Sequence, residues 1–321
     1  MNKISTPLDP VEYSFWTPAP KTAVKVGANE VSVFLPEIPL PIAQADFIAG
    51  SQPTDKQIGT GIYSYLRRFP DCPFNTAYAR ILKDAYSYYI SDLGSQIIML
   101  EAKEVDPPYV RRKISYLKIL ALLESENPAL LMRIGIAYFE LALTYSELVH
   151  VHRELMRALS WLKKSLLLNP RDLTVLNYLG QTCYLLGDYP AVGRYWQGVV
   201  DQLPEGPARL SLQQRLERIS GADLPSRPLV EDLEAVGIAM EHYHQQEFAE
   251  AKLIMDQLEE QGWLPRELPS PDFFYFLGCC REKAGDAAGA FEAYAKALDI
   301  DPQHEGAAAG REGILDGPEG G

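Results

Sequence analysis

Cysteine and histidine are scarce in this chain of 321 residues. It has five histidines and four cysteines, Cys72, Cys183, Cys279 and Cys280, with no CxxC spacing. Two pairs of histidines are two residues apart, which on a helix directs the rings to different sides, whereas a zinc-binding helix places its ligands four apart. We therefore expect no metal site and no cofactor. The cysteine pattern favours a reducing compartment, with the cytoplasm as the default.

Long hydrophobic runs are also missing. No stretch approaches the roughly 18–20 continuous apolar residues of a membrane span. The first residues carry Pro7, Pro10, Pro18 and Pro20 but no apolar run after a basic segment, so they do not resemble a secretory signal. We expect no membrane insertion.

Basic residues are few in the C-terminal half. Residues 171–321 have 12 Lys and Arg against 26 Asp and Glu, whereas residues 1–170 have 18 against 17. An acidic half repels phosphates, so we expect no nucleic-acid binding. It favours a basic or polar partner, although acidity also simply keeps a protein soluble. The overall composition, 47% hydrophobic and 23% charged, is that of a globular protein.

No motif predicts catalysis. Cys72 lies in a turn, and the sequence nominates no base for it. Gly59-Thr60-Gly61 lacks the third glycine and the lysine of nucleotide-binding loops, so it indicates a close contact in a helix. The vicinal Cys279 and Cys280 are interpreted as small packing residues. The basic triplet Arg111–Lys113 is interpreted as a solvated face, with an acidic partner as the alternative. We predict that the protein is not an enzyme.

Residues 1–53 form a Pro-rich segment unlike the rest. Val24 and Val26 alternate before Gly27–Glu30, and Val31, Val33 and Leu35 alternate after it. This pattern around a turn predicts a short β-hairpin that packs on helices. The prolines at 36, 39 and 41 are expected to exclude regular structure.

From residue 54 the hydrophobic period becomes helical. Thr54 or Asp55 is expected to cap a helix that ends at Pro70. One long helix is expected to carry the apolar residues from Tyr78 to Leu100, followed by a break at Pro107-Pro108. Another helix then stops before Pro128. A separate inserted helix is expected over Ala208–Ile219.

A repeat appears in the C-terminal part, where prolines recur behind apolar helices. Its clearest copy reads Phe274-x2-Leu277-Gly278-x2-Arg281, then Gly285-Asp286, Ala290-x3-Tyr294-x2-Ala297 and Pro302. Small residues are expected where the two helices cross, and Gly285 suits a left-handed helix end.

Other copies of the repeat precede this one. One reads Leu176-x2-Leu179-Gly180-x2-Cys183, Gly187-Asp188, Val192-x3-Trp196-x2-Val199 and Pro204. A looser copy contains Ala251-x3-Met255-x2-Leu258, with its proline late at Pro265. The copy that ends at Pro170 has about eight to eleven extra residues between its halves, which would lengthen both helices.

These copies resemble the tetratricopeptide repeat, W-x2-L-G-x2-Y…A-x3-F…P. The resemblance implies an all-α fold, a right-handed α-solenoid of helix pairs, with a small irregular N-terminal cap that contains the β-hairpin. A cap would hide the apolar face of a terminal repeat. We expect diverged pairs over residues 54–128, repeats over 129–302, and a flexible Gly/Ala-rich tail over 303–321.

The resemblance also implies a concave groove lined by the first helix of each repeat. The groove positions, which we predict to bind a peptide, are Asn177, Gln181, Tyr184, Met240, Tyr243 and Tyr275, with Cys279 beside them. No basic residue accompanies Asn177, so a clamp for a terminal carboxylate is not expected. Tyrosine, methionine and amide side chains suit an extended or helical apolar peptide. Each tyrosine has an alternative role in packing against the neighbouring repeat.

Three functions follow from these observations. The first is a non-catalytic adaptor, scaffold or chaperone-like protein that binds a peptide of a protein partner in the groove. The alternative is a structural subunit that forms homo-oligomers or belongs permanently to a larger complex. The third is an enzyme with its site in the N-terminal region, which would require a convergent polar pocket there.

Overall fold

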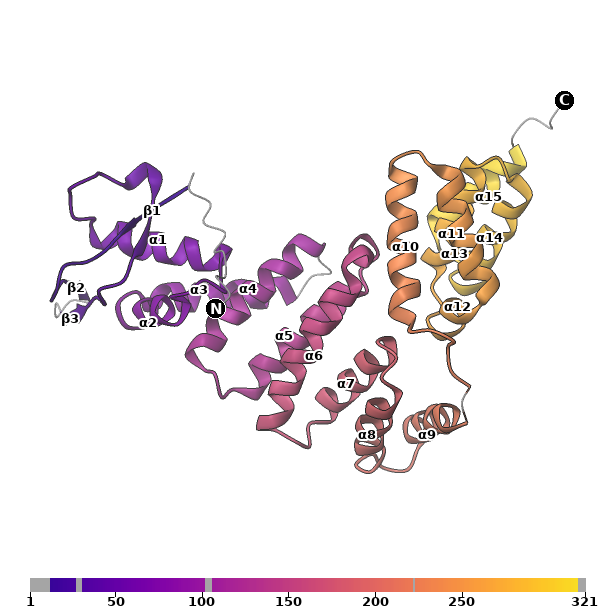
Figure 1. The fold of residues 1–321 in the computed structure, drawn as a ribbon, viewed down its shortest axis with the longest axis horizontal. Helices are drawn as coiled ribbons and strands as arrows, with labels where there is room; N and C mark the ends of the chain where they lie inside the picture. Colours follow the sequence, from indigo (N-terminus) through magenta and orange to yellow (C-terminus); the bar gives the residue numbers. More distant parts are fainter. Residues whose placement is uncertain (1–11, 27–30, 102–105, 222, 317–321) are drawn as a thin grey trace. The chain divides into compact units, whose positions relative to one another are not determined.

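A computed structural model describes residues 12–26, 31–101, 106–221 and 223–316 of the chain (Figure 1). Fifteen α-helices, two 3₁₀ helices and four short strands lie within these ranges. The chain divides into two compact units, Met1–Tyr138 with Ser160–Pro170, and Phe139–Leu159 with Arg171–Gly321. We describe each unit by itself.

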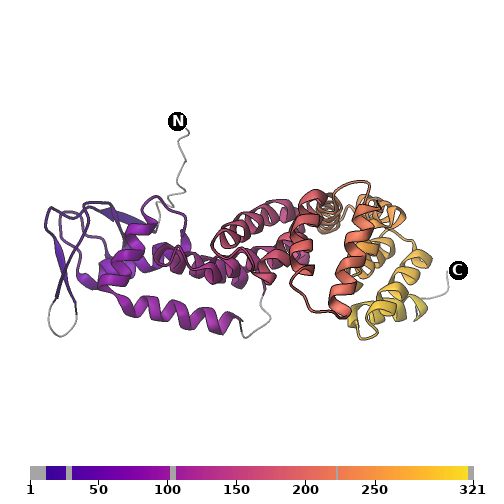
Figure 2. The same ribbon diagram turned by 90° about the horizontal axis from the view of Figure 1, so that it is seen from below.

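Two antiparallel pairs of strands form the cap of the first unit. Strand β1 (Tyr13–Trp16) pairs with β4 (Leu40–Ala43), and β2 (Ala23–Val26) pairs with β3 (Val31–Phe34). The predicted hairpin is therefore confirmed in its strands, while its turn, residues 27–30, lies outside the described residues. Strand β4 packs on helix α1, and strand β2 contacts the next helix, which begins at residue 75 (Figures 1 and 2).

The expectation that the three prolines exclude regular structure is wrong for β4. Pro41 lies within this strand, opposite Phe15. A two-stranded sheet consists only of edge strands, so a proline there need not remove a hydrogen bond of the ladder.

Helix α1 (Asp55–Arg68) begins at Thr54. The Thr54 side chain accepts a hydrogen bond from the Gln57 N–H, and the Gln57 side chain accepts one from the Thr54 N–H. Its glycines allow close contacts, as the sequence indicated. A Cβ atom at Gly61 would lie 2.2 Å from the Pro41 carbonyl oxygen, and one at Gly59 would lie 2.8 Å from the Tyr86 ring.

The single long helix expected over Tyr78–Leu100 is wrong. The structure has α2 (Asn75–Ala85) and α3 (Ser87–Glu101), separated by Tyr86 with φ −136° and ψ 48°. The Tyr86 side chain is buried against α1 at Gly59. The contact between Tyr86 and Gly59 explains why the helix breaks here. The spacing of apolar residues in the sequence does not reveal this contact. Helix α4 (Pro107–Leu123) begins at the predicted proline pair.

The extra residues of the next repeat do not only lengthen its two helices; they also form a separate short helix between them. Helix α5 (Pro128–Ala142) is followed by a 3₁₀ helix, η2 (Tyr145–His150), and then by α6 (Val151–Leu168). Within the first unit, a Cβ atom at Gly135 would lie 2.6 Å from Leu162 Cγ. The expected close crossing of these two helices is therefore present.

Helix pairs also make up the second unit. Its helices are α7 (Leu173–Leu185), α8 (Tyr189–Val200), α9 (Pro207–Ser220), α10 (Leu229–His244), α11 (Phe248–Gln261), α12 (Trp263–Glu267), α13 (Pro271–Lys283), α14 (Ala287–Ile300) and α15 (Glu305–Asp316). Helix α9 is the predicted inserted helix. The late Pro265 lies in the short helix α12.

The repeat residues pack as predicted in the second unit. A Cβ atom at Gly180 would lie 2.2 Å from Trp196 Nε1, and one at Gly278 would lie 2.5 Å from the Tyr294 ring. Gly285 has φ +85° at the turn between α13 and α14. The prediction of an all-α fold built from helix pairs of this kind, with a small cap that contains strands, is confirmed.

Part of the tail predicted to be flexible over residues 303–321 is helical, while residues 317–321 lie outside the described residues. Residues Glu305–Asp316 form α15, which packs on α13 and α14. Its small residues allow this contact, because Ala307 is fully buried and a Cβ atom at Gly310 would lie 2.6 Å from the Tyr294 ring. Gly and Ala are therefore packing residues here.

No single helix in the described ranges is long and apolar enough to cross a membrane. The pair Pro128–Ala142 and Tyr145–Leu168, bent by 107°, meets the criteria of length and composition when taken together. Core helices of folded domains meet the same criteria.

Candidate functional site

The six predicted peptide-binding residues all lie on first helices of the repeats in the second unit. Each is half-buried. Asn177, Gln181 and Tyr184 are four and three residues apart on α7, so they share one face of this helix. Neither Asn177 nor Gln181 has a side-chain hydrogen bond to any other described residue. These two amides are therefore available to a ligand.

Tyr243 and Tyr275 pack against other aromatic residues. The Tyr243 ring lies 5.2 Å from Phe248 and 5.5 Å from Phe276, both edge-on. The Tyr275 ring lies 4.9 Å from His304 and 6.0 Å from Tyr294. Both tyrosines thus stabilise contacts between helices, and their role in peptide binding stays a prediction.

The 3₁₀ helix η2 packs against α10, the helix that carries the predicted positions Met240 and Tyr243. A Cβ atom at Gly237 would lie 2.4 Å from the Val149 nitrogen and 2.8 Å from the Leu148 carbonyl carbon. Only a residue without a side chain permits so close an approach between two backbones. The chain itself therefore occupies part of the predicted groove.

Tyr145 fixes η2 to the last repeat. Its hydroxyl donates a hydrogen bond to the carbonyl oxygen of Asp272 over 3.1 Å, and its ring lies 6.2 Å from Phe276. Burial, followed by the charge of Asp272, raises the pKa of Tyr145, so the phenol stays protonated. This contact leaves a pocket beside η2.

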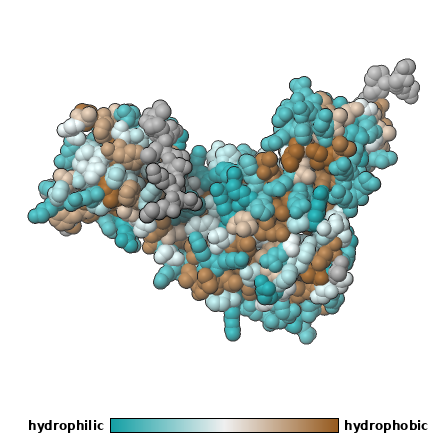
Figure 3. Space-filling view, in the orientation of Figure 1, coloured by the Kyte–Doolittle hydropathy of each residue, from teal (hydrophilic) through white to brown (hydrophobic). Residues whose placement is uncertain are grey.

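The pocket has a volume of about 290 Å³ and lies between η2, α10, α12 and the start of α13. Most of its lining is apolar: Leu143, Tyr145, Leu148, Leu233, Val236, Leu264, Leu268, Pro269 and Phe273, with Ser270 and Glu267 as the polar members. Figure 3 shows hydrophobic residues gathered over the region of α10 and α11. A pocket of this size and composition suits one or two apolar side chains.

Glu267 connects the pocket to α7. Its carboxylate accepts a hydrogen bond from the Tyr184 hydroxyl over 2.7 Å and forms an ion pair with Arg218 of α9. Arg218 and Arg266 both also bind Asp223. Because the Glu267 side chain is only 3% exposed, these partners compensate for its desolvation.

The electrostatics around Glu267 favour fixed protonation states. Burial, and then the hydrogen bond to Glu267, raise the pKa of Tyr184. The hydrogen bond to Glu267 raises the pKa of Arg218. Neither group exchanges a proton near neutral pH, so the arrangement suits binding and positioning rather than acid–base chemistry.

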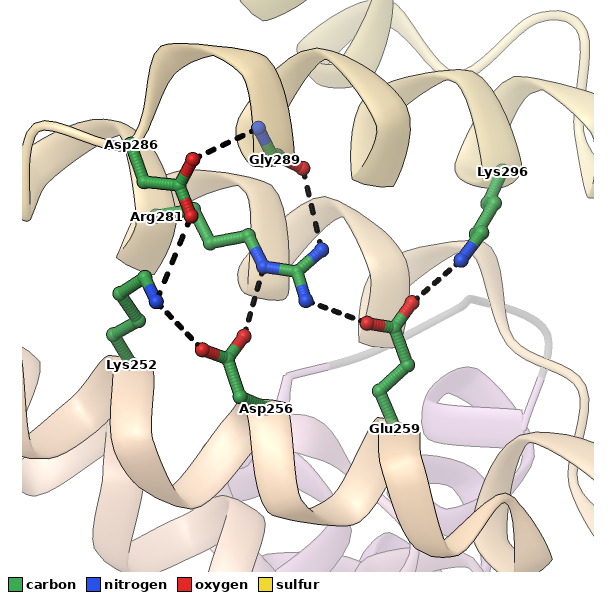
Figure 4. Close-up of polar contacts among 7 residues, drawn as sticks. All are labelled: Lys252, Asp256, Glu259, Arg281, Asp286, Gly289 and Lys296. Atoms are coloured by element: carbon green, nitrogen blue, oxygen red, sulfur yellow. Dashed lines mark hydrogen bonds and ion pairs between the residues drawn. The ribbon is translucent and has the colours of Figure 1, made fainter.

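A second polar network joins the last two repeats (Figure 4). Arg281 on α13 donates to Asp256 over 2.8 Å and to Glu259 over 2.6 Å, both on α11. Lys296 on α14 donates to Glu259 over 2.7 Å. Arg281 lies at the position of the tyrosine in the pattern W-x2-L-G-x2-Y, and its ion pairs take the place of an aromatic contact there. This network holds α11, α13 and α14 in place.

Burial affects the ionisation of two of the four cysteines. Burial raises the pKa of the Cys72 thiol to about 11 and that of Cys280 to about 12, so both thiols stay protonated and unreactive. No three His, Cys, Asp or Glu side chains among the described residues are grouped to hold a metal ion.

Sequence reasoning missed the two segments that shape the site. Helix η2 arises from the extra residues before α6, which were interpreted only as longer helices. Helix α12 and Glu267 lie outside the repeat pattern. The late proline at 265 was a signal that the chain after α11 departs from the pattern, but it did not indicate a contact with Tyr184.

Three solved structures of tetratricopeptide-repeat proteins are similar to this chain. One, from Parabacteroides merdae, is 13% identical with a TM-score of 0.34, and the match covers 81% of this chain and 92% of that one. Another, a thermophilic protein from Thermus thermophilus, is 14% identical with a TM-score of 0.27, covering 70% and 98%. The third, YrrB, described as having an unusual peptide-binding site, is 18% identical with a TM-score of 0.24, covering 61% and 97%. No protein-family model and no curated protein matches the chain.

Proposed function

We propose that this chain is a non-catalytic protein-interaction module that binds an apolar peptide segment of a partner protein. The observation that carries the proposal is the apolar pocket between η2, α10, α12 and α13, whose lining residue Glu267 accepts a hydrogen bond from Tyr184 of α7. One bulky apolar side chain of the peptide enters the pocket, and the peptide backbone lies along α7.

The face of α7 supplies the polar contacts. Gln181 lies one turn before Tyr184, which binds the pocket residue Glu267. The amides of Asn177 and Gln181 each offer a donor and an acceptor to a peptide backbone. Because Glu267 already forms an ion pair with Arg218, the pocket favours an apolar side chain over a cationic one.

Apolar residues on one face of α10 extend the contact with the peptide. Leu233 and Val236 line the pocket, and Met240 follows one turn later on the same face. Methionine adapts its shape to different apolar ligands. The groove positions that remain for a peptide are thus Asn177, Gln181 and Met240, while Tyr184, Tyr243 and Tyr275 hold the surface in shape.

The test is a selection of peptides from a random display library against the intact chain, followed by binding measurements on the selected peptides by fluorescence anisotropy. Ser270→Phe adds a bulky side chain at the pocket wall and should weaken binding at least tenfold. Ser211→Phe adds the same ring at an exposed position of α9 and serves as the matched control. Circular dichroism confirms that both variants are folded.

Equal binding by the two variants would reject the pocket as the peptide site. The structural-subunit function would replace it if the intact chain selects no peptide and its mass in light scattering rises with concentration. Asn177→Ala with Gln181→Ala separately tests the polar face, and an unchanged affinity would exclude it from the site.

A further inference from the structure

The first unit contains a pocket whose lining includes none of the residues that the proposed function uses. It has a volume of about 390 Å³. Its wall comes from the loop after α1 and the start of α2, from the last two turns of α4, and from α5 and the last turns of α6. The pocket is open, and most of its lining is apolar.

Two ammonium groups lie near the Trp161 ring in this pocket. Lys164 Nζ is 4.5 Å from the centre of the indole ring, and Lys118 Nζ is 5.9 Å from it. The electron-rich face of the ring attracts the two cations. The pocket therefore brings an aromatic ring and two positive charges together.

Lys118 stays charged although its side chain is only 12% exposed. Burial opposes its charge, but the neighbouring Tyr138 and Asp71 outweigh burial and raise the pKa of Lys118. Its Nζ donates to Asp71 over 2.7 Å and lies 5.5 Å from the Tyr138 ring. Asp71 is the one acidic residue of the lining, so the lining carries two positive charges and one negative charge.

Lys164 differs from Lys118 in its partners. Lys164 forms no ion pair with any residue in the described part of the chain. Its ammonium group makes a cation–π contact with Trp161. Its charge is thus not compensated by an acidic side chain. A carboxylate of a ligand could form an ion pair with Lys164 without displacing any contact of the fold.

Leucines complete the pocket beside these charges. Leu167 is 82% exposed and Leu168 is 44% exposed on the last turn of α6, and Leu131 of α5 contributes to the same wall. Large apolar side chains exposed next to a pocket often mark an interaction site. The pocket therefore offers both an apolar wall and an uncompensated cation.

We propose that this pocket binds an acidic peptide segment of a partner protein, in which a bulky apolar residue stands next to Asp or Glu. The apolar side chain packs between Trp161 and the leucines, and the adjacent carboxylate pairs with Lys164. Charge complementarity selects this occupant, since a basic segment would face two lysines. A nucleic acid would gain little, because residues 1–170 carry almost equal numbers of positive and negative side chains.

The test uses two synthetic hexapeptides, acetylated and amidated, one alternating Leu with Glu and the other alternating Leu with Lys. Binding to the full chain is measured by tryptophan fluorescence and by calorimetry. The Glu peptide should change the emission, and the change should vanish in Trp161→Phe, which separates it from Trp16, Trp196 and Trp263. The Lys peptide should produce neither signal.

Charge reversal supplies the decisive comparison. Lys164→Glu should weaken binding of the Glu peptide by about tenfold at low salt. Lys163→Glu makes the same change one residue away, outside the pocket lining, and should weaken it by less than about twofold. Ser270→Phe should leave this affinity unchanged, so failure here and failure of the proposed function are distinguishable.

Three results would overturn the inference. One is equal binding of the Glu and Lys peptides, and another is an equal loss of affinity in the two lysine variants. The third is self-association of the intact chain that Lys164→Glu abolishes while neither peptide binds, since the occupant would then be a second copy of the chain.

Discussion

The hydroxyl of Tyr184 lies 2.7 Å from the carboxylate of Glu267, which is 83 residues further along the chain. The contact joins the first helix of a repeat to the short helix α12, which belongs to no repeat motif. Long-range polar contacts of this kind fix where an inserted segment packs, because a buried carboxylate without its partners is costly.

Tyr184→Phe should lower the free energy of unfolding by about 1.5–3 kcal/mol, the usual worth of a hydrogen bond to a charged group. Urea unfolding followed by circular dichroism measures the loss. Tyr189→Phe is the matched control. The Tyr189 hydroxyl is buried without a hydrogen-bond partner among the described residues, so its removal should be neutral or slightly stabilising. Equal losses in the two variants would contradict the importance of the Glu267 contact.

Gly180→Ala should destabilise the second unit by about 1–3 kcal/mol, because the new methyl group would overlap Trp196. Gly193→Ala, in the same repeat, meets no atom within 4 Å and should stabilise its helix by up to about 1 kcal/mol. Thermal unfolding of the two variants gives the comparison. A loss of stability in Gly193→Ala as large as in Gly180→Ala would refute the close crossing of α7 and α8.

The ion pairs of Glu259 should make stability depend on pH. Burial acts to raise the pKa of this carboxyl, but the hydrogen bonds from Lys296 and Arg281 outweigh burial and hold the pKa below its usual range. A lowered pKa in the folded state contributes stability above the unfolded pKa, and this contribution is lost as the pH falls through the folded pKa.

Glu259→Gln should therefore cost more stability at pH 7 than at about pH 4. Urea unfolding at both pH values measures the difference. Glu260→Gln makes the same change at the exposed neighbouring position, outside this network, and is the matched control. A penalty for Glu259→Gln that is equal at both pH values would contradict the network in Figure 4.

Ala307→Glu should detach α15 from the last repeat, because it places an unpaired charge in a fully buried position. Hydrogen exchange of residues 305–316 should accelerate, and Tyr275, which contacts Gly306, should become exposed. Ala309→Glu, on the exposed side of the same helix, should leave exchange unchanged. Fast exchange in the unaltered chain would show that α15 does not pack stably.

Local pattern was sufficient to predict the helix pairs. The spacing of Gly180 and Trp196, or of Gly278 and Tyr294, encodes a crossing between helices that follow each other directly in the chain. Thr54 likewise encodes the start of α1 through a side chain three residues from its partner. Such features depend on neighbours in sequence, so they are readable without a structure.

Features that depend on distant partners could not be predicted. The break at Tyr86 is associated with Gly59, and the order of α15 depends on Tyr275 and Tyr294. The composition of residues 303–321, rich in Gly and Ala, suits both a flexible tail and a closely packed helix. For the candidate site, the repeat pattern predicted positions on α7 and α10, whereas the places of η2 and Glu267 depend on long-range contacts that no local pattern contains.

The close approach of η2 to Gly237 links two parts of the chain that sequence comparison would treat as independent. The glycine is needed because the backbone at Leu148 and Val149 leaves no room for a methyl group. Relatives that have lost the inserted turn before α6 should be free to carry alanine or larger residues at this place in α10. Relatives that keep the turn should keep the glycine, so the insertion and the glycine should be inherited together.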